Sequence, residues 1–186
     1  MKSHLIFTLF FALGILLGCK EKTDNTAHIK LLDSLSVEVV NSMEKFNKID
    51  SLKVKETLNL VNQRLGQLGS VIKDTIEKED AILISDFRAC KKPLKEFQLK
   101  RSGLRKESGV TLKQLENLSR DLKKNLVPAA DVKKFVEMEA ELANLLLINL
   151  SSITESVQNS IQAADSLGPV IEAFIAKQAA LPQKKK

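Results

Sequence analysis

Aromatic residues are scarce in this sequence, which contains no tryptophan, no tyrosine and eight phenylalanines. Three of the eight, Phe7, Phe10 and Phe11, stand close to the start of the chain. Proteins bind sugars and nucleobases largely by stacking them on flat aromatic side chains. The composition therefore argues against a sugar site, and against nucleic acid as a partner even though the chain carries a net charge of +6.

Histidine is equally scarce, since His4 and His28 are the only two. A metal site built on imidazoles and a histidine-centred catalytic triad both need more than these positions offer. Glu137 and Glu141 stand one helical turn apart with Glu139 between them, and such a pair can bind a divalent cation or perform acid and base chemistry. The histidines that accompany carboxylates in di-iron bundles are missing. We therefore favour a solvated acidic face, and expect no metal, no cofactor and no enzymatic activity.

Helix breakers are few, with 7 glycines and 4 prolines. No segment shows a sustained alternation of apolar and polar residues, whereas apolar residues recur every three or four positions along most of the chain. This period predicts an all-α fold, namely an antiparallel up-down bundle of about four long helices, some kinked or broken, plus a short C-terminal helix. An extended coiled-coil dimer is the alternative, because the apolar stripes are spaced like heptads.

Three breaks between helices are predicted from caps and prolines. Residues 47 to 51 offer cap residues and a turn. Pro93 indicates a kink or a helix start near residues 89 to 92, because proline removes a backbone hydrogen bond. Pro128 follows the end of another helical segment and can begin the longest one.

Two further breaks are expected from glycine. Residues 100 to 110 contain two glycines and read as a basic loop. Thr111 and Gln114 then form a capping box, which predicts a helix start at Thr111. We expect the longest segment to stop or kink at Gly168-Pro169, before a short helix from 170 to 180.

Three small residues fall within predicted helices. Gly66 and Gly69 stand about one turn apart, which indicates either a kink or the close approach of another helix, and we favour close packing. Cys90 falls on the apolar stripe of its segment. We interpret it as a buried core thiol in preference to a redox or metal-binding residue.

The first 19 residues have the shape of an export signal. Lys2 precedes an apolar run from residue 5 to 17, which is shorter than the roughly 20 residues that cross a bilayer. The run closes with Leu16-Leu17-Gly18-Cys19, which resembles the lipobox of bacterial lipoproteins. The resemblance implies that a peptidase cleaves after Gly18 and that acyl chains on Cys19, such as palmitate, anchor the protein in a membrane. A plain signal peptide is the alternative.

This resemblance also implies an organisation for the whole chain. Residues 1 to 18 would be the removed signal, 19 to 27 the lipidated cysteine and a flexible tether, 28 to 181 the helical bundle domain and 182 to 186 a basic tail. Cys90 would then lack an intrachain partner, which excludes a disulfide framework. Lys20 follows Cys19, and by the same resemblance this implies the outer membrane more than the inner one.

Charge is distributed unevenly along the chain. Residues 88 to 106 contain eight basic residues and one glutamate, a local net charge of +7, whereas residues 129 to 176 carry two lysines and seven acids, a net of −5. The first explanation is internal, because oppositely charged helices attract and help to set their pairing. The second is contact with anionic lipid headgroups, with lipopolysaccharide or with an acidic protein partner. The eight basic residues are Arg88, Lys91, Lys92, Lys95, Lys100, Arg101, Arg105 and Lys106.

Uncharged polar residues are concentrated in residues 149 to 162. Asn149, Ser152 and Ser156 flank the apolar stripe of this segment. Two hypotheses compete here: a helix wall that packs through small hydroxyl residues, and a polar groove that hydrogen-bonds a ligand. We favour the wall.

Together these features suggest a lipid-anchored protein of the bacterial envelope that acts as a non-enzymatic interaction or scaffold module. The alternative is a small-molecule sensor or carrier bundle with its site between helices near Ser152 and Ser156. A cavity lined by polar side chains would support the carrier, and a filled apolar core would support the scaffold.

Overall fold

The computed structural model describes residues 24 to 180, and every regular element in this part of the chain is an α-helix. The helices are α2 (Thr26–Asn47), α3 (Ser51–Val71), α4 (Lys78–Ala89), α5 (Lys91–Lys123) and α6 (Ala129–Ala180). Four of them are long and pack together, so the predicted all-α class and bundle of long helices are confirmed. The predicted export signal, Cys19 and the basic tail lie outside the described residues.

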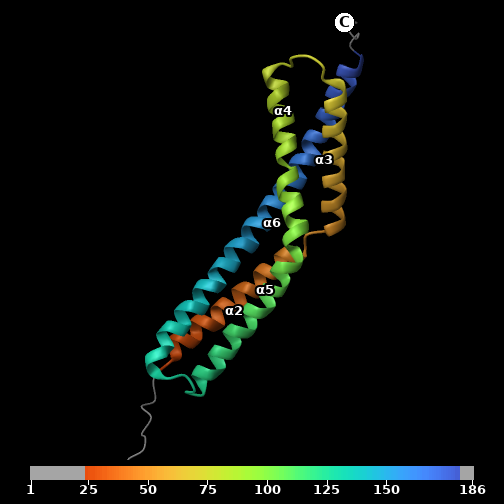
Figure 1. Cartoon of the computed structure of the whole chain (residues 1–186). Coiled ribbons are helices and arrows are strands. Elements are labelled where there is room, and N and C mark those ends of the chain that lie inside the picture. The colour runs from red at the N-terminus through yellow and green to blue at the C-terminus, as the bar shows by residue number, and fades with distance from the viewer. Residues whose placement is uncertain (1–23, 181–186) are drawn as a thin grey trace, which may run out of the picture.

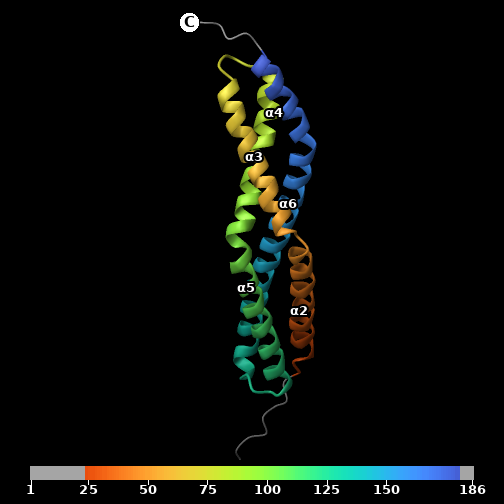
Figure 2. The same ribbon diagram turned by 90° about the vertical axis from the view of Figure 1, so that its right-hand side faces the viewer.

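The helices form a slender rod that runs up, down and up again (Figure 1). α2 and α3 follow one another in one direction, α4 and α5 return, and α6 extends along both halves. In one half α6 packs against α2 and α5, and in the other it packs against α3 and α4 (Figure 2). At a rise of 1.5 Å per residue, α6 is about 78 Å long. Residues 24 and 180 therefore lie at opposite ends of the rod.

The apolar stripes of the helices meet in three clusters stacked along the rod. In the central cluster the rings of Phe46 and Phe97 lie 5.3 Å apart between centroids, in a tilted arrangement. Aliphatic side chains fill the space around them, and the stripe predicted for the longest segment is buried. Large side chains at the centre of the three clusters include Leu32, Leu115 and Leu122, then Phe46, Phe97, Leu146 and Leu150, then Val61, Phe87 and Ile171.

The first half of the rod begins close to the turn between α5 and α6. The backbone N–H of Thr26 donates to Oδ1 of Asp24 at 3.0 Å, and Nδ2 of the buried Asn25 donates to the carbonyl of Leu122 at 3.4 Å. α2 starts at Thr26, so the predicted tether is too long by two residues at its end. Searched over residues 24 to 180, no helix is long and apolar enough to cross a membrane.

The three breaks predicted from caps and prolines are confirmed, the last of them between the end of α5 at Lys123 and the start of α6 at Ala129, directly after Pro128. Asp50 caps α3, where its carboxylate accepts from the backbone N–H of Leu52 at 2.8 Å and of Lys53 at 3.4 Å. α4 ends at Ala89 and α5 begins at Lys91, so Pro93 lies in the first turn of α5, where its missing N–H would have had no helical partner.

The predicted loop at residues 100 to 110 is wrong, because α5 passes through it without a break. The glycines at 103 and 109 are exposed, so they weaken the helix without opening it. Thr111 is buried in the middle of α5 and caps nothing. Tertiary packing explains the difference, because Leu104 and Leu115 are both buried in the core and hold this stretch in helical register.

The predicted stop at Gly168-Pro169 and the separate short helix after it are also wrong, since α6 is continuous to Ala180. Pro169 and Asp165 are both exposed. The carbonyl that loses its hydrogen bond to the proline therefore lies on the water-facing side of α6, where solvent can satisfy it. Ile171 and Phe174 beyond the proline are buried and keep the helix packed.

Gly66 and Gly69 do not mark a close helix contact, contrary to expectation. Both are exposed, and a Cβ added at either position would have no atom within 4 Å. Nothing in the packing requires glycine at these places, so its only local effect is to lower the helix propensity of α3.

Replacing Gly66 by alanine should therefore stabilise the protein. The change removes backbone freedom from the unfolded chain and adds a methyl group in open space, so the free energy of unfolding should rise by about 0.5 to 1 kcal/mol. Urea denaturation followed by circular dichroism measures the change. A loss of stability would instead show that another helix packs closely on this position.

Candidate functional site

Two acidic residues of α6 form ion pairs with α3, and none forms an ion pair with the basic segment within residues 24 to 180. Lys53 Nζ lies 3.0 Å from Asp165 Oδ1, and Arg64 Nη2 lies 2.8 Å from Glu172 Oε2. Within residues 24 to 180, no ion pair joins residues 88 to 106 to α6. The basic and acidic segments are therefore not joined by ion pairs, although α5 and α6 pack against each other, and most of the basic side chains face solvent.

The basic residues face outward because the opposite side of the same helical segment is buried. Leu94 and Phe97 are buried in the central cluster, so the positions between them face solvent. Two of the eight predicted residues are held by the bundle. The guanidinium of Arg101 lies 5.7 Å from the centre of the Phe97 ring, and Nε of Arg105 donates to Oδ1 of Asn47 at 2.9 Å.

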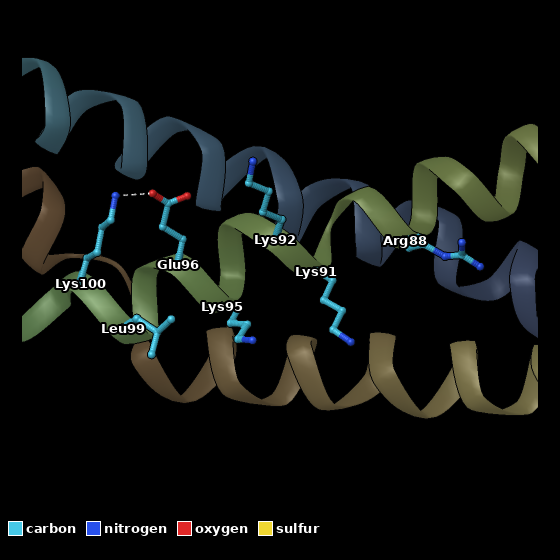
Figure 3. Close-up of a pocket in the computed structure, with 7 residues that line it drawn as sticks. All are labelled: Arg88, Lys91, Lys92, Lys95, Glu96, Leu99 and Lys100. Atoms are coloured by element: carbon cyan, nitrogen blue, oxygen red, sulfur yellow. Dashed lines mark hydrogen bonds and ion pairs between the residues drawn. The ribbon is translucent and has the colours of Figure 1, made fainter.

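Five of the remaining six basic residues line an open groove of about 510 Å³ on the outer side of the α4–α5 junction. Lys91 and Lys95 extend to one side of the helix, and Lys92 and Lys100 to the other (Figure 3). The charged ends of the lysine side chains border the groove, and its floor is apolar. Each lysine carries its charge on a long aliphatic stem, and the apolar side chain of Leu99 is 73 % exposed. Its lining residues are Arg88, Lys91, Lys92, Lys95, Glu96, Leu99 and Lys100.

Glu96 is the only acid in the groove, and it is already engaged. Lys100 Nζ donates to its carboxylate one turn along the helix. This hydrogen bond and the nearby lysine charge lower the pKa of Glu96. The carboxylate thus offsets the charge of Lys100 and leaves the positive charge of Arg88, Lys91, Lys92 and Lys95 uncompensated. A ligand for the groove would carry negative charge.

Asn149 and Ser152 are exposed on α6, and Ser156 is half-buried beside them. They share one side of the helix but do not point into an interior cavity. The hydroxyl of Thr154 donates to the carbonyl of Leu150 at 2.6 Å, so this neighbour is satisfied by its own helix. A ligand at the predicted polar groove would bind on the surface of the rod.

Cys90 lies at the junction of α4 and α5, where it is buried with no disulfide. Burial raises the pKa of its thiol, which keeps the sulfur protonated and unreactive. Among the described residues, no group of three histidine, cysteine or acidic side chains lies close enough to hold a metal ion.

The acidic run on α6 is only partly a solvated face. Glu137 and Glu141 are exposed, but Glu139 is buried and its Oε2 has no hydrogen-bond partner among residues 24 to 180. Helical geometry explains the difference, because Val136, Glu139 and Ala143 recur at intervals of three and four and face the core together. Burial raises the pKa of Glu139, since its charged form loses water.

Comparison of the chain with family models, with curated proteins and with solved structures gave no match. The function must therefore be inferred from the residues and surfaces of this molecule.

The raised pKa of Glu139 makes stability depend on pH. At a pH below 4.5, the ordinary pKa of a glutamate, the Glu139 carboxyl is protonated in both the folded and the unfolded chain, and burying it costs little free energy. Above that value the unfolded chain ionises first, so the free energy of unfolding falls until the folded carboxyl also ionises. Glu139→Gln should therefore be more stable than the parent at pH 7, by about 1 kcal/mol, and equal to it near pH 4.

Urea denaturation at the two pH values measures this difference. Glu141→Gln is the matched control, because Glu141 is exposed two residues away and the change should leave stability within about 0.5 kcal/mol at both pH values. A benefit of Glu139→Gln that is the same at pH 4 and pH 7 would contradict a buried ionising carboxyl.

Proposed function

We propose that this chain is a lipid-anchored interaction module of the bacterial envelope, a non-enzymatic rod that presents the basic groove to an anionic lipid surface. The observation that carries the proposal is that the positive charge of Arg88, Lys91, Lys92 and Lys95 is exposed with no ion-pair partner among the described residues. The lipobox-like sequence ending at Cys19 supports a membrane location. A core built mainly from apolar side chains, together with surface cations that lack an ion-pair partner among the described residues, favours surface contact over catalysis.

The chemistry of the groove favours a lipid headgroup as the partner. Lysine and arginine side chains attract phosphate, and each contributes about 1 kcal/mol near an anionic membrane. Their aliphatic stems and Leu99 form an apolar floor that can meet the upper part of the acyl chains. An acidic folded protein would need a complementary shape for this open groove, whereas a lipid surface adapts to it.

The length of the rod gives the anchor and the groove separate positions. Residue 24 lies beside the end of α5, and the groove lies about 35 to 50 Å further along that helix, counted from Lys123 at 1.5 Å per residue. If the rod lies flat on the membrane that anchors it, the groove reaches the surface of that membrane. If the rod stands upright, the groove points toward a second membrane opposite the first. Either arrangement keeps the protein tethered while the groove binds.

A carrier function has less support. Asn149 and Ser152 are exposed, so the polar residues predicted to line an interior site lie on the outside of α6. The clusters inside the rod consist of apolar side chains. We therefore retain the interaction module as the proposed function.

The anchor is tested by metabolic labelling with a fatty-acid analogue in cells that express the full chain. The parent protein should incorporate label and fractionate with membranes, and Cys19→Ala should lose both properties, because the cysteine sulfur is the acylation point. Equal labelling of the two proteins would refute the anchor.

The groove is tested by vesicle binding in the Cys19→Ala full chain, so that no acyl chain contributes. Replacing Lys91, Lys92 and Lys95 together by glutamine should weaken co-sedimentation with phosphatidylglycerol-containing vesicles about a hundredfold, at about 1 kcal/mol per lysine. Binding by the parent should also weaken as salt is raised.

The matched control replaces Lys45, Lys48 and Lys55, three exposed lysines at the α2–α3 turn, by glutamine. It removes the same net charge and should leave vesicle affinity within about threefold, since its charges lie outside the groove. Equal losses for the two triple variants would show a general charge effect and contradict a specific basic site.

A further inference from the structure

The side of α5 that faces away from the core carries a regular series of exposed residues. The series begins at Arg88, at the end of α4, continues along α5 and ends at Lys124, in steps of three or four residues. Such steps keep side chains on one side of a helix. The buried stripe of α5, which includes Leu94, Leu104 and Leu115, lies on the opposite side. We call the exposed series the outer α5 line.

Positive charge is spread along the whole of the outer α5 line. Three of its cations belong to the basic groove and three lie beyond it, and all six are exposed. At 1.5 Å per residue, the part from Lys92 to Lys124 is about 48 Å long. Arg120 also lies on the line, but it is paired with Asp121 and is not counted. The six cations are Arg88, Lys92, Lys95, Lys106, Lys113 and Lys124.

None of the four acidic residues of α5 lies on this line. Glu96 and Asp121 are each in an ion pair with a basic residue of α5. Glu107 and Glu116 are exposed, but helical geometry turns them to the two flanks of the line. A partner that lies along the line therefore meets cations with no carboxylate between them.

The other outer sides of this half of the rod have a different character. α5 runs beside α2 and α6 in the half that begins near residue 24 (Figure 1). α6 exposes Glu137, Glu141 and Glu155, and α2 exposes Glu38 and Glu44. An anionic surface would be repelled by these carboxylates, so charge complementarity selects the outer side of α5.

We propose that this half of the rod lies flat on an anionic lipid membrane, with the outer α5 line against the lipid from Arg88 to Lys124. The line extends the lipid contact of the proposed function beyond the groove, and it rests on that function for the nature of the partner. Its cations attract headgroup phosphates along its whole length. Leu99 and Val110, which are 73 % and 57 % exposed, lie among the cations and can enter the boundary between headgroups and acyl chains.

The position of residue 24 agrees with a flat rod. Asp24 lies beside the end of α5, because the next residue, Asn25, donates to the carbonyl of Leu122. Cys19, the proposed acylation point, stands five residues before Asp24, and five residues of fully extended chain reach about 17 Å. The anchor would therefore hold the Lys124 end of the line close to the membrane, while the groove holds the other end.

Vesicle binding by a second triple variant of the Cys19→Ala full chain tests the line beyond the groove. Lys106, Lys113 and Lys124 are replaced together by glutamine. They lie about 16 Å or more from Lys95, the nearest unpaired cation of the groove, which exceeds the Debye length of about 8 Å at physiological salt. Affinity for phosphatidylglycerol-containing vesicles should fall about a hundredfold, because each lysine contacts the lipid surface directly.

The α2–α3 triple variant described above is the matched control for this loss of charge, and its vesicle affinity should stay within about threefold of the parent. Thermal unfolding of the new variant should be nearly unchanged, since all three lysines are exposed.

A fluorophore on the line tests the orientation directly. An environment-sensitive fluorophore is attached to the Cys19→Ala chain at Val110→Cys, with Val37→Cys on α2 and Ile148→Cys on α6 as controls. Val37 and Ile148 are 58 % and 64 % exposed. Vesicles should lower iodide quenching at position 110 about threefold, because the label enters the headgroup region, and should leave it unchanged at the other two positions. The Cys19→Ala chain, in which Cys90 is buried, gives the labelling background.

Flat binding is overturned if the new triple variant binds vesicles as tightly as the α2–α3 control, or if position 110 is shielded no more than positions 37 and 148. If the groove variant is still weakened, those results leave the proposed function standing and show that the groove alone touches lipid. A parent chain that does not bind the vesicles would overturn both proposals, and is the result that an acidic protein partner for the line would give.

Discussion

The structure depends on burial of one continuous stripe along α6, which is apolar except at Glu139 and Ser160. Residues from Val132 to Phe174 on this stripe are buried, and each other helix packs its own stripe against it. In proteins most of the stability of a helix comes from such packing of its amphipathic face. The same burial explains why α6 tolerates Pro169, and why α2 and α3 stay aligned across the turn capped by Asp50.

This constraint decided which features could be predicted from the sequence. Apolar spacing predicted the helical class and the buried position of Cys90, and proline predicted the break near Pro93. Local signals failed where packing overrides them, as at the glycines of α5 and at the apparent capping box of Thr111. A capping box describes only four residues, whereas Leu104 and Leu115 on either side of it are fixed by contacts with other helices. The cost of about 1 kcal/mol for an exposed glycine is smaller than the loss from exposing two leucines.

The candidate site also combines features that the sequence predicts with features that only the packing of the helices decides. Sequence alone located the basic residues, because charge clustering is visible without a structure. It could not say which acids they would meet, because that depends on which side of α6 each neighbour occupies. Asp165 and Glu172 lie on the side toward α3, where Lys53 and Arg64 compensate them. The burial of Glu139 was missed because alternate glutamates resemble a solvated run, although its spacing from Val136 and Ala143 matches the core stripe.

The slenderness of the rod limits where a function can lie. Each level of the described bundle is built from three helices, so every side chain is either in the single central row or on the surface. The central row consists mainly of leucine, valine, isoleucine and phenylalanine, with a few small or polar residues such as Ala143, Cys90 and Glu139 among them. Specificity must then come from surface features that differ from one helix to the next. α5 presents uncompensated cations and α6 presents exposed aliphatic residues beside carboxylates, while both helices face the core with the same kind of side chain. Two outer surfaces of different character make the rod asymmetric around its axis, and that asymmetry allows a partner to distinguish the cationic groove at the α4–α5 junction from the rest of the rod.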